Sequence, residues 1–313
     1  TLACIIQANC APTPKILKSL CDGQTLQNTR TIHSETPMLL SDADTTLILE
    51  TVRDTARREI MPRFRALSEA DINTKSAPDD LVTAADLAAE ALITAQLGRA
   101  FPDALILGEE AVAADPNLRD QLADAEMAII IDPVDGTWNY ARGLALFGVI
   151  LAVTRYGIPV YGLLYDPVID DWIVSQEDAV TCYTNARNSR ALRLPATPPE
   201  TKAGGYVPLG SLPDPHRLRV AALWPEIGRL NSLRCACHEF RMLAQGHVDF
   251  MLSTRLTPWD HAAGVLVVQQ AGGTAKMLDG SAYSAVRRDG YLLSARSADA
   301  WSEIQQAFSF LLD

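Results

Sequence analysis

The chain has 313 residues, enough for one large domain or two ordinary ones, and 48 % of them are hydrophobic. Its formal net charge of −11 argues against broad binding of nucleic acids or anionic membranes through charge alone, so neither partner is expected. No apolar run approaches the roughly 20 residues that a membrane helix needs. The cysteine spacing does not resemble a disulfide framework, which predicts a cytoplasmic protein.

Residues 1–40 are interpreted as an N-terminal extension, either disordered or a start-site artefact. They carry scattered prolines and polar residues, and they lack the basic stretch ahead of an apolar core that marks a signal peptide. Met38 is the first methionine, and a regular pattern begins just after it. We therefore expect residues 1–37 to derive from an upstream start assignment.

Two helices are predicted next. The first starts at a cap around Ser41 and runs to about residue 65. The second covers residues 83–101, where Thr83 can cap the helix and Asp86 falls in the first turn, a position at which a carboxylate suits the helix dipole.

The following apolar runs predict strands that belong to a sheet. They cover residues 104–107, 127–131, 147–155, 159–166 and 172–176. A polar, proline-rich stretch at about 185–200 is the predicted boundary between a metal-binding half (41–190) and a C-terminal α/β half (191–313).

The C-terminal half alternates predicted helices and strands, which indicates α/β layers. The predicted elements are a helix over 216–229, a helix ending near Gly246, a strand over 248–252, and a helix that opens at Pro258 and ends before Gly272.

Four acidic residues stand just after a strand or at a helix start. Asp132 and Asp135 end the apolar run 128–131, and each would raise the pKa of the other unless positive charge lay between them. Glu109 and Asp260 occupy similar positions, so the four side chains are expected to meet at one edge of the layers. Hard cations such as Mg²⁺ take oxygen ligands of this kind.

Two such cations would suit the hydrolysis of a phosphate monoester. The backbone N–H groups of Gly136 and Thr137 can approach phosphate oxygens closely, because Gly136 has no side chain. The hydroxyl of Thr137 can hydrogen-bond the attacking water and pass its proton toward Asp86.

Blander interpretations exist for single residues. Asp-Pro and Asp-Gly are ordinary turn dipeptides, Glu109-Glu110 and Lys75 can be solvated surface, and Asp86 can be only a favourable first-turn charge. His261 is interpreted as a helix-start residue rather than a ligand. Cys235 and Cys237 are interpreted as small semi-buried residues on a strand rather than a metal site. The chain has no G-x-S-x-G elbow, and Ala203-Gly204-Gly205 lacks the lysine of a P-loop.

Taken together, four motifs resemble those of the inositol monophosphatase family, within the superfamily that includes fructose-1,6-bisphosphatase. The resemblance covers about residues 42–310, and the motifs occur in the family's order. They are Lys75-Ser76-x-Pro78-x-Asp80-Leu81-Val82-Thr83-x-x-Asp86, Gly108-Glu109-Glu110, Asp132-Pro133-Val134-Asp135-Gly136-Thr137-x-Asn139-Tyr140 and Trp259-Asp260-x-Ala262-Ala263-Gly264.

The resemblance implies a layered αβαβα fold and a Mg²⁺-dependent, often Li⁺-inhibited and commonly dimeric phosphatase. Glu109, Asp132 and the carbonyl of Val134 would hold the first metal, and Asp132, Asp135 and Asp260 the second. A third, weaker cation would lie near Glu109. Thr137, with Asp86 or Glu109, would orient the nucleophilic water, which makes these three the candidate catalytic residues.

The substrate is expected to be a small phosphorylated alcohol, with inositol 1-phosphate as the leading choice. Candidate substrate contacts are Asp135, Arg234 and Ser253. Ser253 stands where the family carries an acidic residue that contacts the inositol ring, and loss of that carboxylate should weaken cyclitol specificity. Arg234 can pair with a second anionic group on the substrate, or it can form a structural ion pair. Histidinol phosphate, a sugar phosphate and a nucleotide 3′-phosphate stay open.

One alternative belongs to a different class, because some bacterial relatives act in RNA or transcription complexes. The net acidity disfavours direct RNA binding, and the complete set of candidate metal ligands favours an enzyme.

Overall fold

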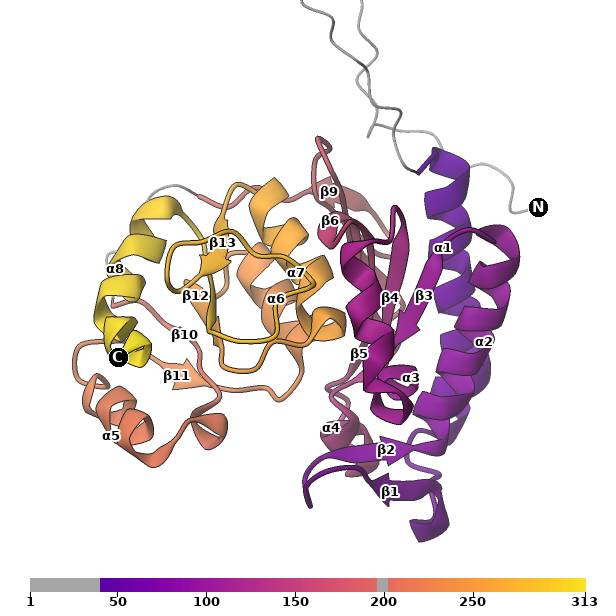
Figure 1. The fold of residues 1–313 in the computed structure, drawn as a ribbon, viewed down its shortest axis with the longest axis horizontal. Coiled ribbons are helices and arrows are strands. Elements are labelled where there is room, and N and C mark those ends of the chain that lie inside the picture. The colour runs from indigo at the N-terminus through magenta and orange to yellow at the C-terminus, as the bar shows by residue number, and fades with distance from the viewer. Residues whose placement is uncertain (1–39, 196–201) are drawn as a thin grey trace, which may run out of the picture. The chain divides into compact units, whose positions relative to one another are not determined.

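A computed structural model of the chain describes residues 40–195 and 202–313 (Figure 1). The predicted extension at residues 1–40 lies outside the described residues except for Leu40, and so does part of the predicted boundary stretch. Leu39–Asp313 form one compact unit. Within the part of the chain that is described, no helix is long and apolar enough to cross a membrane.

The larger sheet has seven strands in the order β3-β4-β5-β6-β7-β8-β9. Strands β3 and β4 pair in parallel, and the other neighbours pair antiparallel. The strands are β3 (Leu105–Gly108), β4 (Ala128–Asp135), β5 (Gly148–Arg155), β6 (Ile158–Asp166), β7 (Asp171–Gln176), β8 (Cys182–Thr184) and β9 (Ser189–Ala191). The first five confirm the predicted strands, whereas β8 and β9 were not predicted, because each has only three residues and contains no apolar run.

The smaller sheet has five strands in the order β11-β10-β12-β14-β13, and a separate hairpin joins β1 to β2. The strands are β1 (Ile72–Thr74), β2 (Leu81–Thr83), β10 (Gly205–Tyr206), β11 (Leu230–Asn231), β12 (Phe250–Ser253), β13 (Thr274–Met277) and β14 (Leu292–Ala295).

Five of the helices in the described residues were predicted from the sequence, and three were not. The helices are α1 (Asp42–Thr55), α2 (Ala84–Ala100), α3 (Glu109–Ala114), α4 (Thr137–Ala141), α5 (Asp214–Ala222), α6 (Ala236–Ala244), α7 (Pro258–Gln270) and α8 (Ala298–Phe308). Ser41 and Thr83 cap α1 and α2 with reciprocal side-chain hydrogen bonds, as the sequence predicts. The predicted end of the helix over 216–229 is wrong, since α5 ends at Ala222.

The elements stack in five layers, which confirms the expected αβαβα arrangement (Figure 1). Helices α1 and α2 cover one face of the larger sheet, and α6 and α7 lie between the two sheets. Helices α5 and α8 belong with the outer face of the smaller sheet. Three apolar cores fill the spaces between the layers, and strand β4 contributes side chains to two of them. Ile129 and Ile131 face α1 and α2, whereas Ile130 faces α7.

A β-bulge interrupts β4 between Asp132 and Asp135. Asp132 pairs with Ile150 and Asp135 with Gly148, so β4 takes three steps where β5 takes two. In a regular strand, residues three apart point to opposite faces, but one extra residue restores a common face. The bulge therefore turns both carboxylates toward the helices between the sheets.

Candidate active site

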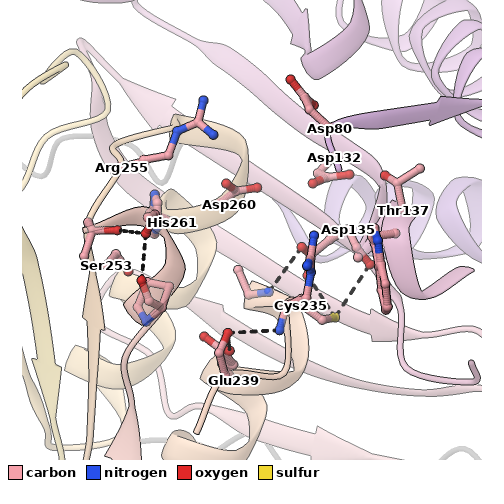
Figure 2. A pocket seen from close by; sticks show the side chains of 18 of the residues that line it. Asp80, Asp132, Asp135, Thr137, Cys235, Glu239, Ser253, Arg255, Asp260 and His261 are labelled. Atoms are coloured by element: carbon pink, nitrogen blue, oxygen red, sulfur yellow. Dashed lines mark hydrogen bonds between the residues drawn. The ribbon is translucent and has the colours of Figure 1, made fainter. Parts of the chain in front are cut away.

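Three carboxylates meet where β4 approaches the start of α7. Asp132, Asp135 and Asp260 each offer one oxygen, and these oxygens all lie within 4.8 Å of one another. Figure 2 shows Asp260 facing Asp132 across the cleft, with Asp135 below them. Asp132 is buried, and its Oδ1 accepts a hydrogen bond from the backbone N–H of Val134 at 3.0 Å. The donor set is therefore compact and made of oxygen, which suits a hard cation.

Asp135 is held by the start of α6. Its carboxylate accepts hydrogen bonds from the backbone N–H of Ala236 at 3.1 Å and of Cys237 at 2.5 Å. The thiol of Cys235 donates to the same carboxylate at 3.1 Å. The expectation that Cys235 and Cys237 lie on a strand is wrong, because Cys235 is the N-cap residue of α6 and Cys237 lies in its first turn, where free N–H groups attract a carboxylate.

Burial makes ionisation of this cluster costly. Burial, followed by the charges of Glu109, Asp135 and Asp260, raises the pKa of Asp132 well above its usual range. For the same leading reason the pKa of Asp135 rises to about 7 and that of Glu109 to about 8. Positive charge placed between these groups would remove the penalty.

Glu109 lies at the first position of α3 and borders the same cleft, although it is not one of the three closest carboxylates. The ammonium of Lys75 contacts Glu109 Oε1 at 2.7 Å and Glu110 Oε1 at 2.6 Å. The interpretation of Lys75 and Glu109-Glu110 as solvated surface is therefore wrong, since these side chains are largely buried and form a local ion-pair network.

Thr137 connects the cluster to Asp86. Its hydroxyl lies 3.1 Å from Asp86 Oδ1 and 3.0 Å from the carbonyl oxygen of Val134, so its single proton has two possible acceptors. Asp86 also caps α2 by accepting from Thr83, so it is more than a solvated first-turn charge. Burial raises the pKa of Asp86.

A cleft of about 330 Å³ opens over the carboxylates, and Gly136, Arg234 and Ser253 border it as well. Gly136 has a φ of +88°, a conformation that favours glycine, and a Cβ there would lie 3.0 Å from the carbonyl of Leu146. Arg234 contacts Asp79 at 3.1 Å and stacks over Trp138. Ser253 is buried, and its hydroxyl has no hydrogen-bond partner in the described structure.

Sequence reasoning missed three charged residues of the cleft, Asp79, Glu239 and Arg255, of which Figure 2 labels the last two. Glu239 accepts a hydrogen bond from the backbone N–H of Leu233 at 2.6 Å, and burial raises its pKa to about 7. Arg255 lies five residues before Asp260, in a loop whose sequence carries no recognisable pattern. His261 accords with its predicted helix-start position, and its Nδ1 lies 2.7 Å from the carbonyl of Thr257.

The same layered fold occurs in solved structures. An IMPase of Thermotoga maritima has a TM-score of 0.72 and 21 % sequence identity, with 86 % of this chain and 97 % of that chain covered. At this identity the likeness establishes the fold alone.

Sequence comparison establishes more. The model of the inositol monophosphatase family matches residues 42–308, and the chain belongs to this family. It is 30 % identical to an inositol-1-monophosphatase of Mesorhizobium japonicum, over 72 % of this chain and 82 % of that protein. It is 31 % identical to a histidinol-phosphatase of Streptomyces coelicolor, over 72 % of this chain and 84 % of that protein. The chain is accordingly a phosphoric monoester hydrolase.

Proposed function

We propose that the protein is a Mg²⁺-dependent phosphomonoesterase that hydrolyses a small phosphorylated alcohol. The observation that supports this most directly is the set of three carboxylate oxygens within 4.8 Å of one another at the floor of the cleft. Buried carboxylates at this spacing repel one another, and a divalent cation is the simplest compensation.

The proposed ligand sets divide the carboxylates between two cations. Glu109, Asp132 and the carbonyl of Val134 would hold one, Asp132, Asp135 and Asp260 the other, and a third, weaker cation would lie near Glu109. The all-oxygen donor set fits Mg²⁺ better than a softer metal. When bound, Mg²⁺ supplies positive charge that lowers the pKa of water and stabilises a leaving alkoxide.

The protein's own residues have separate tasks in this proposal. The hydroxyl of Thr137 orients the attacking water, and its hydrogen bond to Asp86 at 3.1 Å gives the proton a path away from the reacting oxygen. Glu109 would assist in orienting that water. The backbone N–H groups of Gly136 and Thr137 hold the phosphate oxygens, because the left-handed turn at Gly136 leaves space beside them.

Inositol 1-phosphate is the reference substrate, because relatives of known name include inositol-1-monophosphatases. Asp135, Arg234 and Ser253 are the proposed contacts with the alcohol. Histidinol phosphate fits less well, because its ammonium group would share the cleft with Arg234 and Arg255. Sugar phosphates and nucleotide 3′-phosphates carry no such group and stay in the test panel.

Three further properties belong to the same proposal. The enzyme would act in the cytoplasm as a homodimer, and Li⁺ would inhibit it. Residues 41–190 and 191–313 would be its two halves, which meet at the carboxylates because Asp260 comes from the second.

Phosphate release from a panel of monoesters tests the function, with Mg²⁺ or a chelator and with or without Li⁺. We expect turnover only with Mg²⁺, and at least a hundredfold loss of kcat in Glu109→Gln and Asp135→Asn while both variants keep their fold by circular dichroism. Asp103→Asn removes an equal charge from an exposed position and serves as the control. Undiminished turnover in either site variant would contradict the assigned ligand roles.

A further inference from the structure

A second cavity lies beside the candidate metal centre. Its volume is about 720 Å³, and it shares Asp80, Glu109, Arg255 and Asp260 with the first cleft. Because the two cavities share these walls, a molecule whose phosphate sits at the carboxylates can extend toward the second cavity.

Four cationic side chains line this second cavity, and they differ in their partners. Lys75 pairs with Glu109 and Glu110, and Arg288 pairs with Asp120. Arg119 and Arg255 form no ion pair with any carboxylate among the described residues. Arg119 donates one guanidinium hydrogen bond to the carbonyl of Arg287, but its buried Nε–H has no partner there.

This arrangement is costly at Arg119, which is partly buried, whereas Arg255 is exposed and stays hydrated. Burial and the charge of Arg288 lower the pKa of Arg119, which indicates that a cation is disfavoured at this position. A partly buried guanidinium without an anionic partner is normally avoided. A phosphate or carboxylate placed here would supply the missing negative charge, because guanidinium groups bind both anions through paired hydrogen bonds.

The first cleft is compatible with such a substrate on the side that carries Arg255, where Ser253 also lies (Figure 2). Ser253 presents a buried hydroxyl without a partner, which can bind a hydroxyl of the alcohol. An acidic side chain at this position would repel a second anion, whereas serine does not. Arg255 borders both cavities, on the side of the cleft that carries Asp260 and His261 (Figure 2).

We propose that Arg255 and Arg119 form an anion subsite that receives a second anionic group, a phosphate or a carboxylate, carried by the alcohol portion of the substrate. The inference rests on the proposed phosphomonoesterase function and narrows its substrate class. The preferred esters would be bisphosphates or phosphorylated hydroxy acids rather than neutral cyclitol phosphates.

Matched substrate pairs test the subsite in the Mg²⁺-loaded enzyme. Glycerol 3-phosphate and 3-phosphoglycerate differ by a carboxylate, and fructose 1-phosphate and fructose 1,6-bisphosphate differ by a phosphate at longer reach. We expect wild-type kcat/KM to be about tenfold higher for the doubly anionic member of at least one pair, the effect of one charge-assisted hydrogen bond.

The variants then assign the effect to Arg255. Arg255→Gln should lose about tenfold in kcat/KM on the preferred doubly anionic ester and less than twofold on its partner, and Arg255→Lys should recover part of the loss. Arg99→Gln, at an exposed arginine of α2 that lines neither cavity, should change turnover of neither substrate.

Other outcomes would contradict the proposed anion subsite. Equal losses on both members of a pair would place Arg255 at the transferred phosphate instead. If sulfate in solution altered glycerol 3-phosphate turnover in wild type but not in Arg255→Gln, and no pair showed selectivity, the anion would come from solution rather than from the substrate. A wild-type enzyme that hydrolyses monoesters without preference would refute only the subsite, whereas absence of Mg²⁺-dependent turnover on every ester would refute the proposed function itself.

Discussion

The carboxylate cluster should make the stability of the metal-free protein depend on pH. Burial and neighbouring carboxylates raise the pKa of Asp135 from 3.8 to about 7 and that of Glu109 from 4.5 to about 8. A carboxyl whose pKa is higher in the folded state contributes stability that is fully present below its ordinary pKa and is lost as pH rises through the folded value. The metal-free protein should therefore lose stability between about pH 4 and about pH 8.

The expected size follows from Asp135. A rise in pKa from 3.8 to about 7 corresponds to at most on the order of 4 kcal/mol of unfolding free energy, of which about 3 kcal/mol falls between pH 5 and pH 8. Since about 1 kcal/mol moves the Tm of a domain of this size by roughly 2 °C or more, the Tm in a chelator should fall by about 5 °C over that range. Saturating Mg²⁺ should remove most of the fall, because in the proposed function it binds the ionised cluster.

Asp132→Asn separates this repulsion from general charge effects. The amide oxygen can still accept the hydrogen bond that Val134 now donates to Asp132 Oδ1, while the charge is gone. In a chelator at pH 8 this variant should unfold several degrees above wild type, and Mg²⁺ should stabilise it less. Asp103→Asn changes the net charge equally at an exposed site and should behave like wild type.

Differential scanning calorimetry at pH 5, 6, 7 and 8 measures the Tm of wild type, Asp132→Asn and Asp103→Asn, each with chelator and with Mg²⁺. A wild-type Tm in chelator that stays constant from pH 5 to pH 8 would show that neither burial nor mutual repulsion disfavours the ionised carboxylates. An Asp132→Asn variant less stable than wild type at pH 8 would refute the reasoning in the same way.

Two further predictions concern the packing that supports the site. A Cβ at Gly148 would lie 2.5 Å from the sulfur of Cys237, so Gly148→Ala should displace the start of α6. We expect it to lower the free energy of unfolding in urea by about 1–3 kcal/mol and to reduce turnover. Gly210→Ala is the control, because a Cβ there meets no atom within 4 Å, and it should change neither stability nor turnover. Arg241 and Asp171 form a buried ion pair, so Arg241→Met should cost about 3–5 kcal/mol, whereas Arg58→Met, which breaks an exposed pair with Asp54, should cost less than about 1 kcal/mol. Similar costs for the two arginine variants would mean that burial does not govern these pairs.

Local sequence signals predicted much of the fold. The caps at Ser41 and Thr83 and the strands β4 to β7 follow from short-range chemistry, namely a hydroxyl that accepts an N–H and apolar runs bounded by turns. The same signals missed β8 and β9, because each strand has only three residues and neither contains an apolar run.

The other sequence predictions that were wrong or incomplete concern contacts between segments that lie far apart in the chain. Nothing near Lys75 in sequence shows that its ammonium lies between Glu109 and Glu110, more than thirty residues away. Nothing near Cys235 shows that the first turn of α6 donates to Asp135, a hundred residues earlier. Arg255 was missed for the same reason, since its importance depends on two cavities that only the folded chain defines.

The bulge in β4 explains how a sequence with carboxylates three residues apart becomes a single binding site. Without the extra residue, Asp132 and Asp135 would face opposite layers, and one of them would enter the core that α1 and α2 cover. Because Pro133 cannot donate a hydrogen bond, the ladder is already weakened where the bulge occurs. Asp135 then meets the N–H groups of α6, and Asp132 meets Asp260 from α7. The geometry of the candidate site thus depends on the packing of α6 and α7 against the larger sheet as much as on the acidic residues themselves.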